Sequence, residues 1–161
     1  MGSVRPTAFE YSLFTRKPEQ NVFPVLSELG IGVTAYGVLA HGLFSGKAKS
    51  AEKGGHRSHL PWFHPGNFEQ NMKLVDALAA IAAENQVTAS QMAIAWALAK
   101  RTDLVPVVGA RTMEQLESTL AALRLQLSAE DVARIEAAVP PEAVAGTRYL
   151  PQLMKMLDSE R

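Results

Sequence analysis

The chain has 161 residues, of which 16 are basic and 16 acidic, so its formal net charge is 0. This length suits one domain with a sizeable core, and a composition of 47% hydrophobic and 20% charged residues is typical of a folded globular protein. The balanced charge excludes the single-sign field that attracts nucleic acid or an anionic membrane. Cysteine is absent, which excludes disulfides, thiolate metal sites and a cysteine nucleophile. No apolar stretch approaches the ~20 residues of a membrane helix, so we expect one cytoplasmic domain over residues 1–161.

The first part of the chain predicts two strands separated by a helix. Apolar and polar residues alternate over residues 6–14, as in a strand with one buried face. Apolar residues then recur at helical spacing over residues 19–29, and Gly30 stands where a C-terminal glycine cap belongs. Residues 31–36 predict a second strand, which a glycine-rich run over residues 37–47 follows. Such a run lets the backbone approach a ligand closely, and it is equally compatible with a flexible turn.

Residues 48–68 predict a long loop, because glycine and proline recur there without apolar periodicity. Loops of this length are uncommon in compact domains unless they cover a site, so this segment is a candidate active-site flap. It holds His56, His59 and His64, whose spacing raises the alternative of a metal site. No carboxylate or fourth ligand recurs nearby, so we favour solvated loop histidines and expect no bound metal.

Two helices and a third strand are predicted next. Residues 69–84 place apolar side chains on one face of a helix. Thr88, with Gln91 three positions later, predicts a capping box at the start of a second helix with a long apolar stripe. A short β-branched run over residues 104–108 predicts the third strand.

A tight turn follows that strand at Gly109, Ala110 and Arg111. Thr112 and Gln115 stand at the spacing of a capping box, so a helix is predicted to start there. The amide groups and positive dipole end of such a helix favour an anion, and Arg111 adds a fixed fork for phosphate. The alternative from these residues is an ordinary loop whose arginine pairs with a carboxylate.

A last helix is predicted over residues 129–138, with Ser128 as its N-cap. The tail, residues 146–161, mixes apolar and charged residues, and we expect it to dock on another surface.

Strands that alternate with helices indicate parallel βα units in a sheet covered by helices, so the natural parents are a TIM barrel or a doubly wound sheet. Three strands leave open edges and cannot close a barrel of eight. The architecture is therefore expected to be incomplete.

Four motifs, in order, resemble the aldo-keto reductase family. They are residues 10–16 (EYSLFTR), 29–39 (LGIGVTAYGVL), 42–47 (GLFSGK) and 105–112 (VPVVGART). The chain resembles only the C-terminal part of that family. The resemblance implies an α/β fold that is part of a (β/α)8 TIM barrel: the last three βα units, with the C-terminal helix and tail.

The resemblance also implies NADP(H) as cofactor. Tyr36 matches the residue that stacks on the nicotinamide ring, although a tyrosine at a strand end is also compatible with a core position. The loop that runs along the pyrophosphate is matched by Gly37, Leu39, Gly42 and Leu43, and Lys47 matches a basic residue over the phosphates. The positions that hold the adenosine end and its 2′-phosphate are matched by Gly109, Ala110, Arg111 and Gln115. A 2′-phosphate site implies NADPH over NADH.

Three positions depart from the family pattern. Ala8 stands where the family has a glutamine for the nicotinamide carboxamide, and Ser118 and Thr119 replace a Glu-Asn pair near the adenine. Each missing polar partner is expected to weaken nucleotide binding by about 1–3 kcal/mol.

The family reduces carbonyls with a general-acid tyrosine assisted by lysine, aspartate and histidine, all on earlier strands that this sequence does not show. His41, Tyr11 and Tyr149 have no lysine at an informative spacing, so no catalytic residue is expected in this chain. Three functions remain open. The chain is a truncated, NADPH-binding half of a carbonyl or aldehyde reductase that an N-terminal half chain completes, a non-catalytic nucleotide sensor, or a structural remnant that depends on a partner or forms a homo-oligomer.

Overall fold

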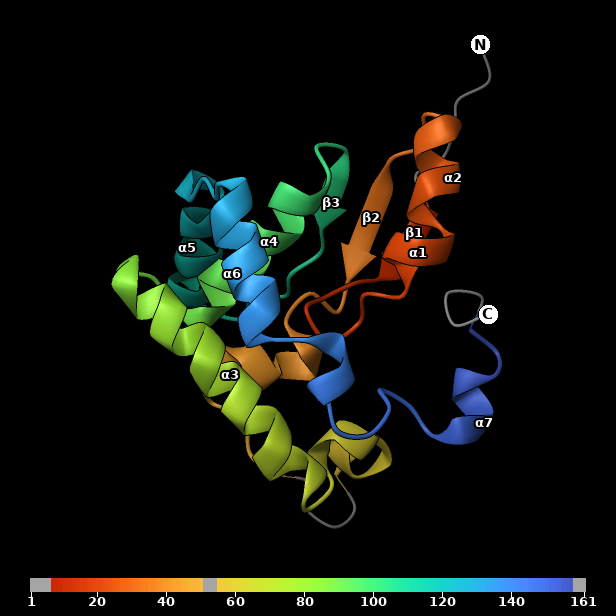
Figure 1. The fold of residues 1–161 in the computed structure, drawn as a ribbon. Helices are drawn as coiled ribbons and strands as arrows, with labels where there is room; N and C mark the ends of the chain where they lie inside the picture. The colour runs from red at the N-terminus through yellow and green to blue at the C-terminus, as the bar shows by residue number, and fades with distance from the viewer. Residues whose placement is uncertain (1–6, 51–54, 158–161) are drawn as a thin grey trace.

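The computed structural model describes residues 7–50 and 55–157. Its sheet has three parallel strands in the order β1-β2-β3: β1 (Thr7–Glu10), β2 (Val33–Tyr36) and β3 (Leu104–Pro106) (Figure 1). Glu10 pairs with Tyr36, and Ala35 pairs with Pro106. All three strands therefore end at the same edge of the sheet, which we call the carboxyl edge.

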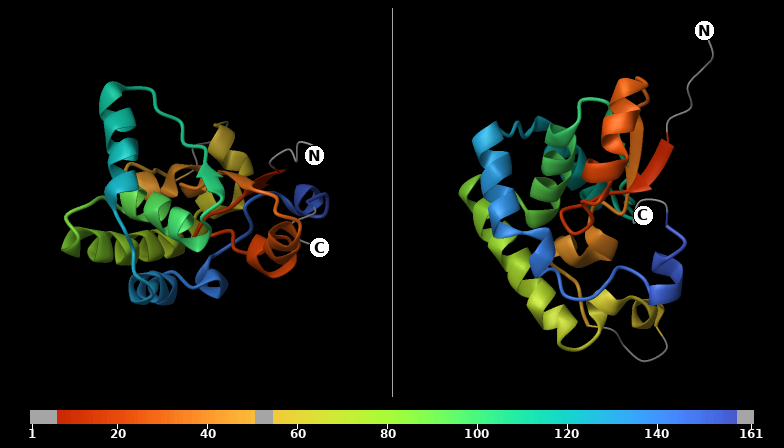
Figure 2. Two further views of the ribbon diagram at one scale, coloured as in Figure 1. Left: turned by 90° about the horizontal axis from the view of Figure 1, so that it is seen from above. Right: turned by 45° about the vertical axis from the view of Figure 1, so that its right-hand side comes forward.

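Seven α-helices are formed by the described residues. They are α1 (Pro18–Asn21), α2 (Phe23–Glu28), α3 (Asn67–Glu84), α4 (Ala89–Lys100), α5 (Met113–Ala121), α6 (Ala129–Ala138) and α7 (Pro151–Met154). Helix α4 is central, because it contacts α3, α5, α6 and β3. Helices α1 and α2 lie at the opposite end of the molecule from α5 (Figure 2). None of the helices in the described ranges is long and apolar enough to cross a membrane.

In the described residues the helices cover only one face of the sheet. Val33, Ala35 and Leu104 are buried in the main core. Ala8 and Val105, which point to the other face, are exposed. The helices of the described residues therefore pack against one face of the sheet, whereas a parallel sheet normally has both faces covered.

Local helix signals are confirmed. The Thr88 hydroxyl accepts from the Gln91 amide at 3.2 Å, and the Gln91 side chain accepts from the Thr88 amide at 2.8 Å. Ser128 and Asp131 form the same reciprocal pair at the start of α6. Each box satisfies two amide groups that the first helical turn leaves without partners.

The first strand and first helix are shorter than predicted. The strand ends at Glu10 because the chain turns back between Ser12 and Thr15, whose amide donates to the Ser12 carbonyl at 2.9 Å. The predicted helix over residues 19–29 is divided into α1 and α2, and Pro24 in the first turn of α2 has no amide hydrogen to donate. Leu29 is exposed rather than buried, since α2 ends before it.

The predicted loop over residues 48–68 is wrong from residue 55 onward. This part forms two 3₁₀ helices, His56–His59 and Pro61–Phe63, and residues 51–54 lie outside the described residues. Trp62 and Phe63 are buried in the core, so aromatic burial holds the segment where no periodicity was visible. A flap role stays a prediction. Within the described residues, no group of three histidine or acidic side chains is placed to hold a metal ion.

Candidate functional site

The carboxyl edge brings together the connections that follow β2 and β3. The Val107 amide donates to the Ala35 carbonyl at 2.7 Å, which extends the pairing of the two strands beyond β3. Ligands of parallel α/β proteins bind outside the carboxyl ends of the strands, where backbone groups are not used by the sheet. The ten predicted cofactor residues lie in or after these two strands.

Tyr36 ends β2 on the uncovered face of the sheet. Its side chain is 41% exposed, so the structure does not place it as a core tyrosine. Gly37 follows with a φ of 67°, and a Cβ there would lie 2.8 Å from the Glu10 Cγ. Only glycine suits that backbone and that contact. The aromatic ring therefore stands at the open edge, next to a glycine that leaves room for the Glu10 side chain.

The glycine-rich run after β2 is folded rather than flexible. Residues Ala40–Ser45 form a 3₁₀ segment with a kink, where His41 and Gly42 have φ of 53° and 90°. Leu43 is buried and Leu39 is half-buried, so these two side chains pack inward. A ligand at this run would meet backbone groups and Lys47, which is exposed.

The turn after β3 is the most open part of the edge. Gly109, Ala110 and Arg111 are all exposed, and a Cβ at Gly109 would meet nothing within 4 Å. The Thr112 hydroxyl accepts from the Gln115 amide at 3.2 Å, which confirms the predicted N-cap. The Gln115 side chain accepts from the Arg111 amide at 2.8 Å, one residue earlier than in a capping box. This bond holds the turn, while the Arg111 guanidinium forms no ion pair with any described carboxylate.

A buried polar cluster, which sequence reasoning missed, lies directly beside Tyr36. The Glu10 carboxylate is 1% exposed; its Oε2 accepts from the Tyr149 hydroxyl at 2.9 Å and lies 3.5 Å from the Arg148 Nη1. Its Oε1 lies 3.3 Å from the His41 Nε2. We call these four residues the Glu10 cluster. It joins β1, the glycine-rich run and the C-terminal tail.

The cluster changes the interpretation of two side chains. His41 packs against the rings of Trp62 and Tyr149, at centroid distances of 5.8 and 5.6 Å. Burial and the hydrogen bond to the Glu10 carboxylate raise the pKa of Tyr149.

The start of the predicted tail is docked through Tyr149, whereas Leu153 and Met156 further along are exposed. The sequence offered one sign of this cluster, a glutamate at the end of a strand. Alternation of apolar and polar residues, however, assigns such a glutamate to a solvated face.

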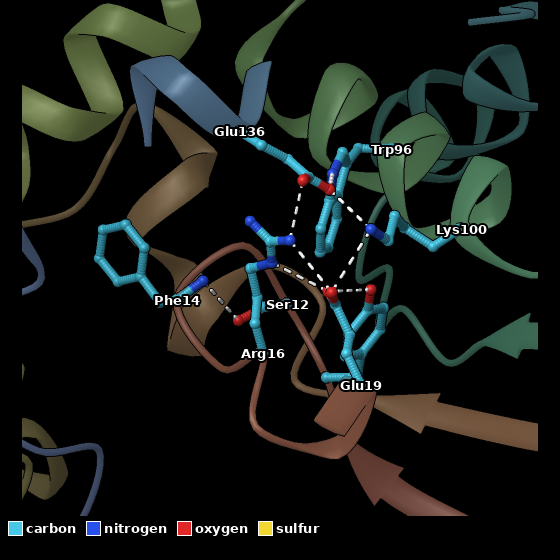
Figure 3. Close-up of polar contacts among 8 residues, drawn as sticks. Ser12, Phe14, Arg16, Glu19, Trp96, Lys100 and Glu136 are labelled. Carbon is cyan, nitrogen blue, oxygen red and sulfur yellow. Dashed lines mark hydrogen bonds and ion pairs between the residues drawn. The ribbon is translucent and has the colours of Figure 1, made fainter. Parts of the chain in front are cut away.

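A second network lies outside the edge and is structural (Figure 3). Arg16 contacts Glu19 at 2.9 Å and Glu136 at 2.8 Å, and Lys100 contacts Glu136 at 2.8 Å. The Trp96 indole donates to the same Glu136 carboxylate at 3.1 Å. These bonds tie the start of α1 to α4 and α6.

Tyr11 belongs to this network and is fully buried. Its hydroxyl donates to Glu19 at 2.8 Å, and its ring stacks on Trp96 at a centroid distance of 5.2 Å. Burial and the Glu19 carboxylate raise the pKa of Tyr11 strongly. Tyr11 is therefore engaged in packing and in a hydrogen bond within the core.

A cleft of about 270 Å³ lies between the β1–α1 connection and the chain after α6. Its lining includes Phe14, Lys17, Trp62, Arg16 and Arg148, and none of the ten predicted cofactor residues. Two of the three cations already face carboxylates, Arg16 at Glu19 and Arg148 at Glu10. The cleft therefore has little net charge to attract an anion.

The comparisons with known proteins agree with the motifs. A family model described as the aldo/keto reductase family matches residues 7–140. The chain belongs to the aldo/keto reductase family. A probable aldo-keto reductase of soybean (Glycine max) is 34% identical over 142 residues, which cover 87% of this chain and 41% of that protein.

Solved structures of the family share the fold. The glycerol dehydrogenase of Gluconobacter oxydans superposes with a TM-score of 0.74 at 26% identity, over 83% of this chain and 42% of that one. A thermostable aldo-keto reductase gives a TM-score of 0.58 at 21% identity, over 81% and 38% of the two chains, and shows the fold alone. This aldo/keto reductase chain thus spans about two-fifths of the length of the relatives it matches.

Proposed function

We propose that this chain is the NADP(H)-binding part of an aldo/keto reductase barrel and that it reduces carbonyl or aldehyde substrates once the remaining strands are supplied. The family membership supports an oxidoreductase. The match to about two-fifths of each relative supports the reading of β1 to β3 as the last three strands of a (β/α)8 barrel.

The observation that carries the proposal is the open carboxyl edge of β2 and β3. Tyr36 offers an exposed flat ring there, which suits stacking on a nicotinamide. Lys47 and Arg111 are exposed, and neither forms an ion pair with a described carboxylate, so their charges are available to phosphate. The bare turn at Gly109 leaves room for close backbone approach. These residues fit an anionic dinucleotide.

In this proposal each group has a binding task. Tyr36 orients the nicotinamide, the backbone of residues 37–46 follows the pyrophosphate, and Arg111 holds the 2′-phosphate, with Gln115 holding the turn that carries it. The bound nicotinamide supplies the hydride. The proton donor comes from the remaining part of the barrel, because Tyr11 is buried and the Tyr149 hydroxyl already donates a hydrogen bond to Glu10.

Arg111→Ala tests the nucleotide site. We expect the Kd for NADPH, measured by cofactor fluorescence, to rise at least about tenfold while the Kd for NADH stays unchanged, because a charge-assisted bond to the 2′-phosphate is lost. Arg124→Ala, an exposed arginine in the turn after α5, is the matched control. Equal losses for both cofactors, or no loss, would contradict the assignment of Arg111.

Completion of the enzyme is tested with a half-barrel. The part of the soybean relative outside the match is mixed with this chain, and NADPH oxidation is followed with a panel of aldehydes. We expect a rate above that of either part alone. No such rate, together with NADPH binding, would favour the second candidate, a nucleotide sensor without chemistry. That candidate is favoured by the engagement of both Tyr11 and Tyr149 in structural hydrogen bonds.

A further inference from the structure

A buried carboxylate lies on the face of the sheet that the helices leave open. Glu10 and Tyr36 are register partners on β1 and β2, so their side chains stand side by side on that face. Tyr36 is 41% exposed, whereas the Glu10 side chain is 1% exposed. The C-terminal tail accounts for this difference, because it places Tyr149 and Arg148 against the Glu10 carboxylate.

The tail reaches Glu10 from an anchor of its own. The Asn71 side chain, fully buried on α3, donates to the Ala145 carbonyl at 3.0 Å and accepts from the Ala145 amide at 2.8 Å. These two bonds fix the backbone three residues before Arg148. The family match ends at residue 140, so this part of the tail lies outside it. Arg148 is therefore held near the sheet by contacts that do not involve Glu10.

Arg148 and Glu10 form a buried pair of opposite charges. The Arg148 Nη1 lies 3.5 Å from the Glu10 Oε2, and the two side chains are 3% and 1% exposed. Water and salt screen buried charges much less than exposed ones, so the field of either group alone would extend to its neighbours. As a pair, the two charges cancel.

This pair borders the position proposed for the nicotinamide ring. Gly37, directly after Tyr36, lies against the Glu10 side chain, since a Cβ there would be 2.8 Å from the Glu10 Cγ. Burial, the Glu10 carboxylate and Tyr36 all raise the pKa of Tyr149, so Tyr36 is within electrostatic range of the Glu10 cluster. A ring stacked on Tyr36 would experience any net charge of this cluster.

The two oxidation states of a nicotinamide differ in charge. The oxidised ring of NADP+ is positive, and the ring of NADPH is neutral because it has taken up a hydride, which is one proton with two electrons. A net negative charge beside the ring stabilises the oxidised form, and a net positive charge destabilises it.

We propose that Arg148 cancels the field of Glu10 at the nicotinamide, and that the tail thereby sets the balance between the binding of NADP+ and of NADPH. The identity of the cofactor rests on the proposed function. The ratio of the two affinities fixes how far binding shifts the reduction potential of the cofactor, because binding and reduction are linked equilibria. A purely structural pair has no such effect, since its loss weakens the binding of both forms alike.

Charge variants test the proposal by the sign of their effects. The Kd values of NADP+ and NADPH are measured for the full chain by titration calorimetry at pH 8. Arg148→Gln leaves the charge of Glu10 uncancelled, and we expect it to lower the ratio of the NADP+ Kd to the NADPH Kd at least about threefold. Glu10→Gln leaves the charge of Arg148 and should raise the ratio by a similar factor. The double variant should restore the wild-type ratio.

Two controls separate charge from folding. Lys155→Gln removes a positive charge from an exposed position of the same tail and should leave the ratio unchanged. Adenosine 2′,5′-bisphosphate has no nicotinamide, so its Kd should be the same in every variant. Urea unfolding identifies the variants that fold. If Arg148→Gln does not fold, the ratio in Glu10→Gln alone decides the outcome.

The remaining outcomes overturn the proposal. It is wrong if the ratio stays constant, if both single variants shift it in the same direction, or if Lys155→Gln shifts it as much. The proposed function is judged separately. A wild-type chain that binds both cofactor forms, with a ratio that these changes do not alter, keeps the cofactor and rejects only this inference, whereas a chain that binds neither form rejects both.

Discussion

Glu10 is the residue on which the carboxyl edge depends. It is a buried carboxylate, and burial of a charge is costly unless hydrogen bonds and opposite charges compensate it. The hydrogen bond from the Tyr149 hydroxyl and the charge of Arg148, both from the tail, compensate it, and His41 of the glycine-rich run packs beside it, with its Nε2 3.3 Å from Glu10 Oε1. One side chain therefore sets the positions of two segments that border Tyr36, the residue proposed to meet the cofactor.

Tyr149→Phe tests this role at the residue scale. The change removes the hydroxyl that donates to Glu10 and leaves the ring in place. We expect the free energy of unfolding in urea to fall by about 1.5–3 kcal/mol, since the bond goes to a charged group. Tyr36→Phe is the control, because its exposed hydroxyl makes no hydrogen bond with a described residue. Similar effects of both changes would show that the Glu10 cluster is not stabilising.

At the scale of elements, two helices with similar N-caps have opposite surroundings. Helix α4 buries most of its residues, including Met92 and Trp96, whereas α5 buries none. Both start with a threonine that accepts from a glutamine amide, at Thr88 and Thr112. The cap energy is therefore comparable, but only α4 is part of the cooperative core.

Cap substitutions should separate these two cases. Thr88→Ala is expected to lower global stability by about 0.5–2 kcal/mol, because α4 opens only when the core opens. Thr112→Ala should leave global stability nearly unchanged and speed hydrogen exchange in α5 alone. Mass-spectrometric hydrogen exchange and urea unfolding of both variants measure this difference. A global loss of the same size in both would mean that α5 belongs to the core.

At the scale of the whole molecule, the Arg16 network joins distant parts of the chain. Glu136 on α6 forms ion pairs with Arg16, which lies before α1, and with Lys100 at the end of α4. Burial alone would raise the pKa of Glu136, but the hydrogen bond from Lys100 and the charge of Arg16 outweigh burial and lower it below its ordinary 4.5. A carboxylate with a lowered pKa stabilises the fold above pH 4.5, and that contribution is lost as the pH falls further.

Glu136→Gln should remove this part of the acid sensitivity. We expect the variant to be less stable than wild type at neutral pH and to lose less stability on acidification below pH 4.5. Glu130→Gln, an exposed glutamate on the same helix, is the control and should follow the wild-type curve. Thermal unfolding between pH 3 and 7 checks this, and parallel curves for Glu136→Gln and wild type would contradict it.

The local features of this protein follow from the sequence because they depend on neighbours along the chain. The caps at Thr88, Thr112 and Ser128 each join residues three positions apart, and three parallel strands with their helices are readable from periodicity. The four motifs likewise identified the family, which the comparisons confirm.

The tertiary structure alone decided what covers each surface. The hydrogen bond between Tyr149 and Glu10 spans 139 positions, so no local pattern indicates that this glutamate is buried. Trp62 is held by burial in the core rather than by periodicity. Helix α5 has apolar residues at helical spacing, but Met113, Leu116 and Leu120 stay exposed, whereas α4 is buried on nearly all sides. Periodicity specifies that a face is apolar, whereas burial depends on whether another part of the molecule reaches that face.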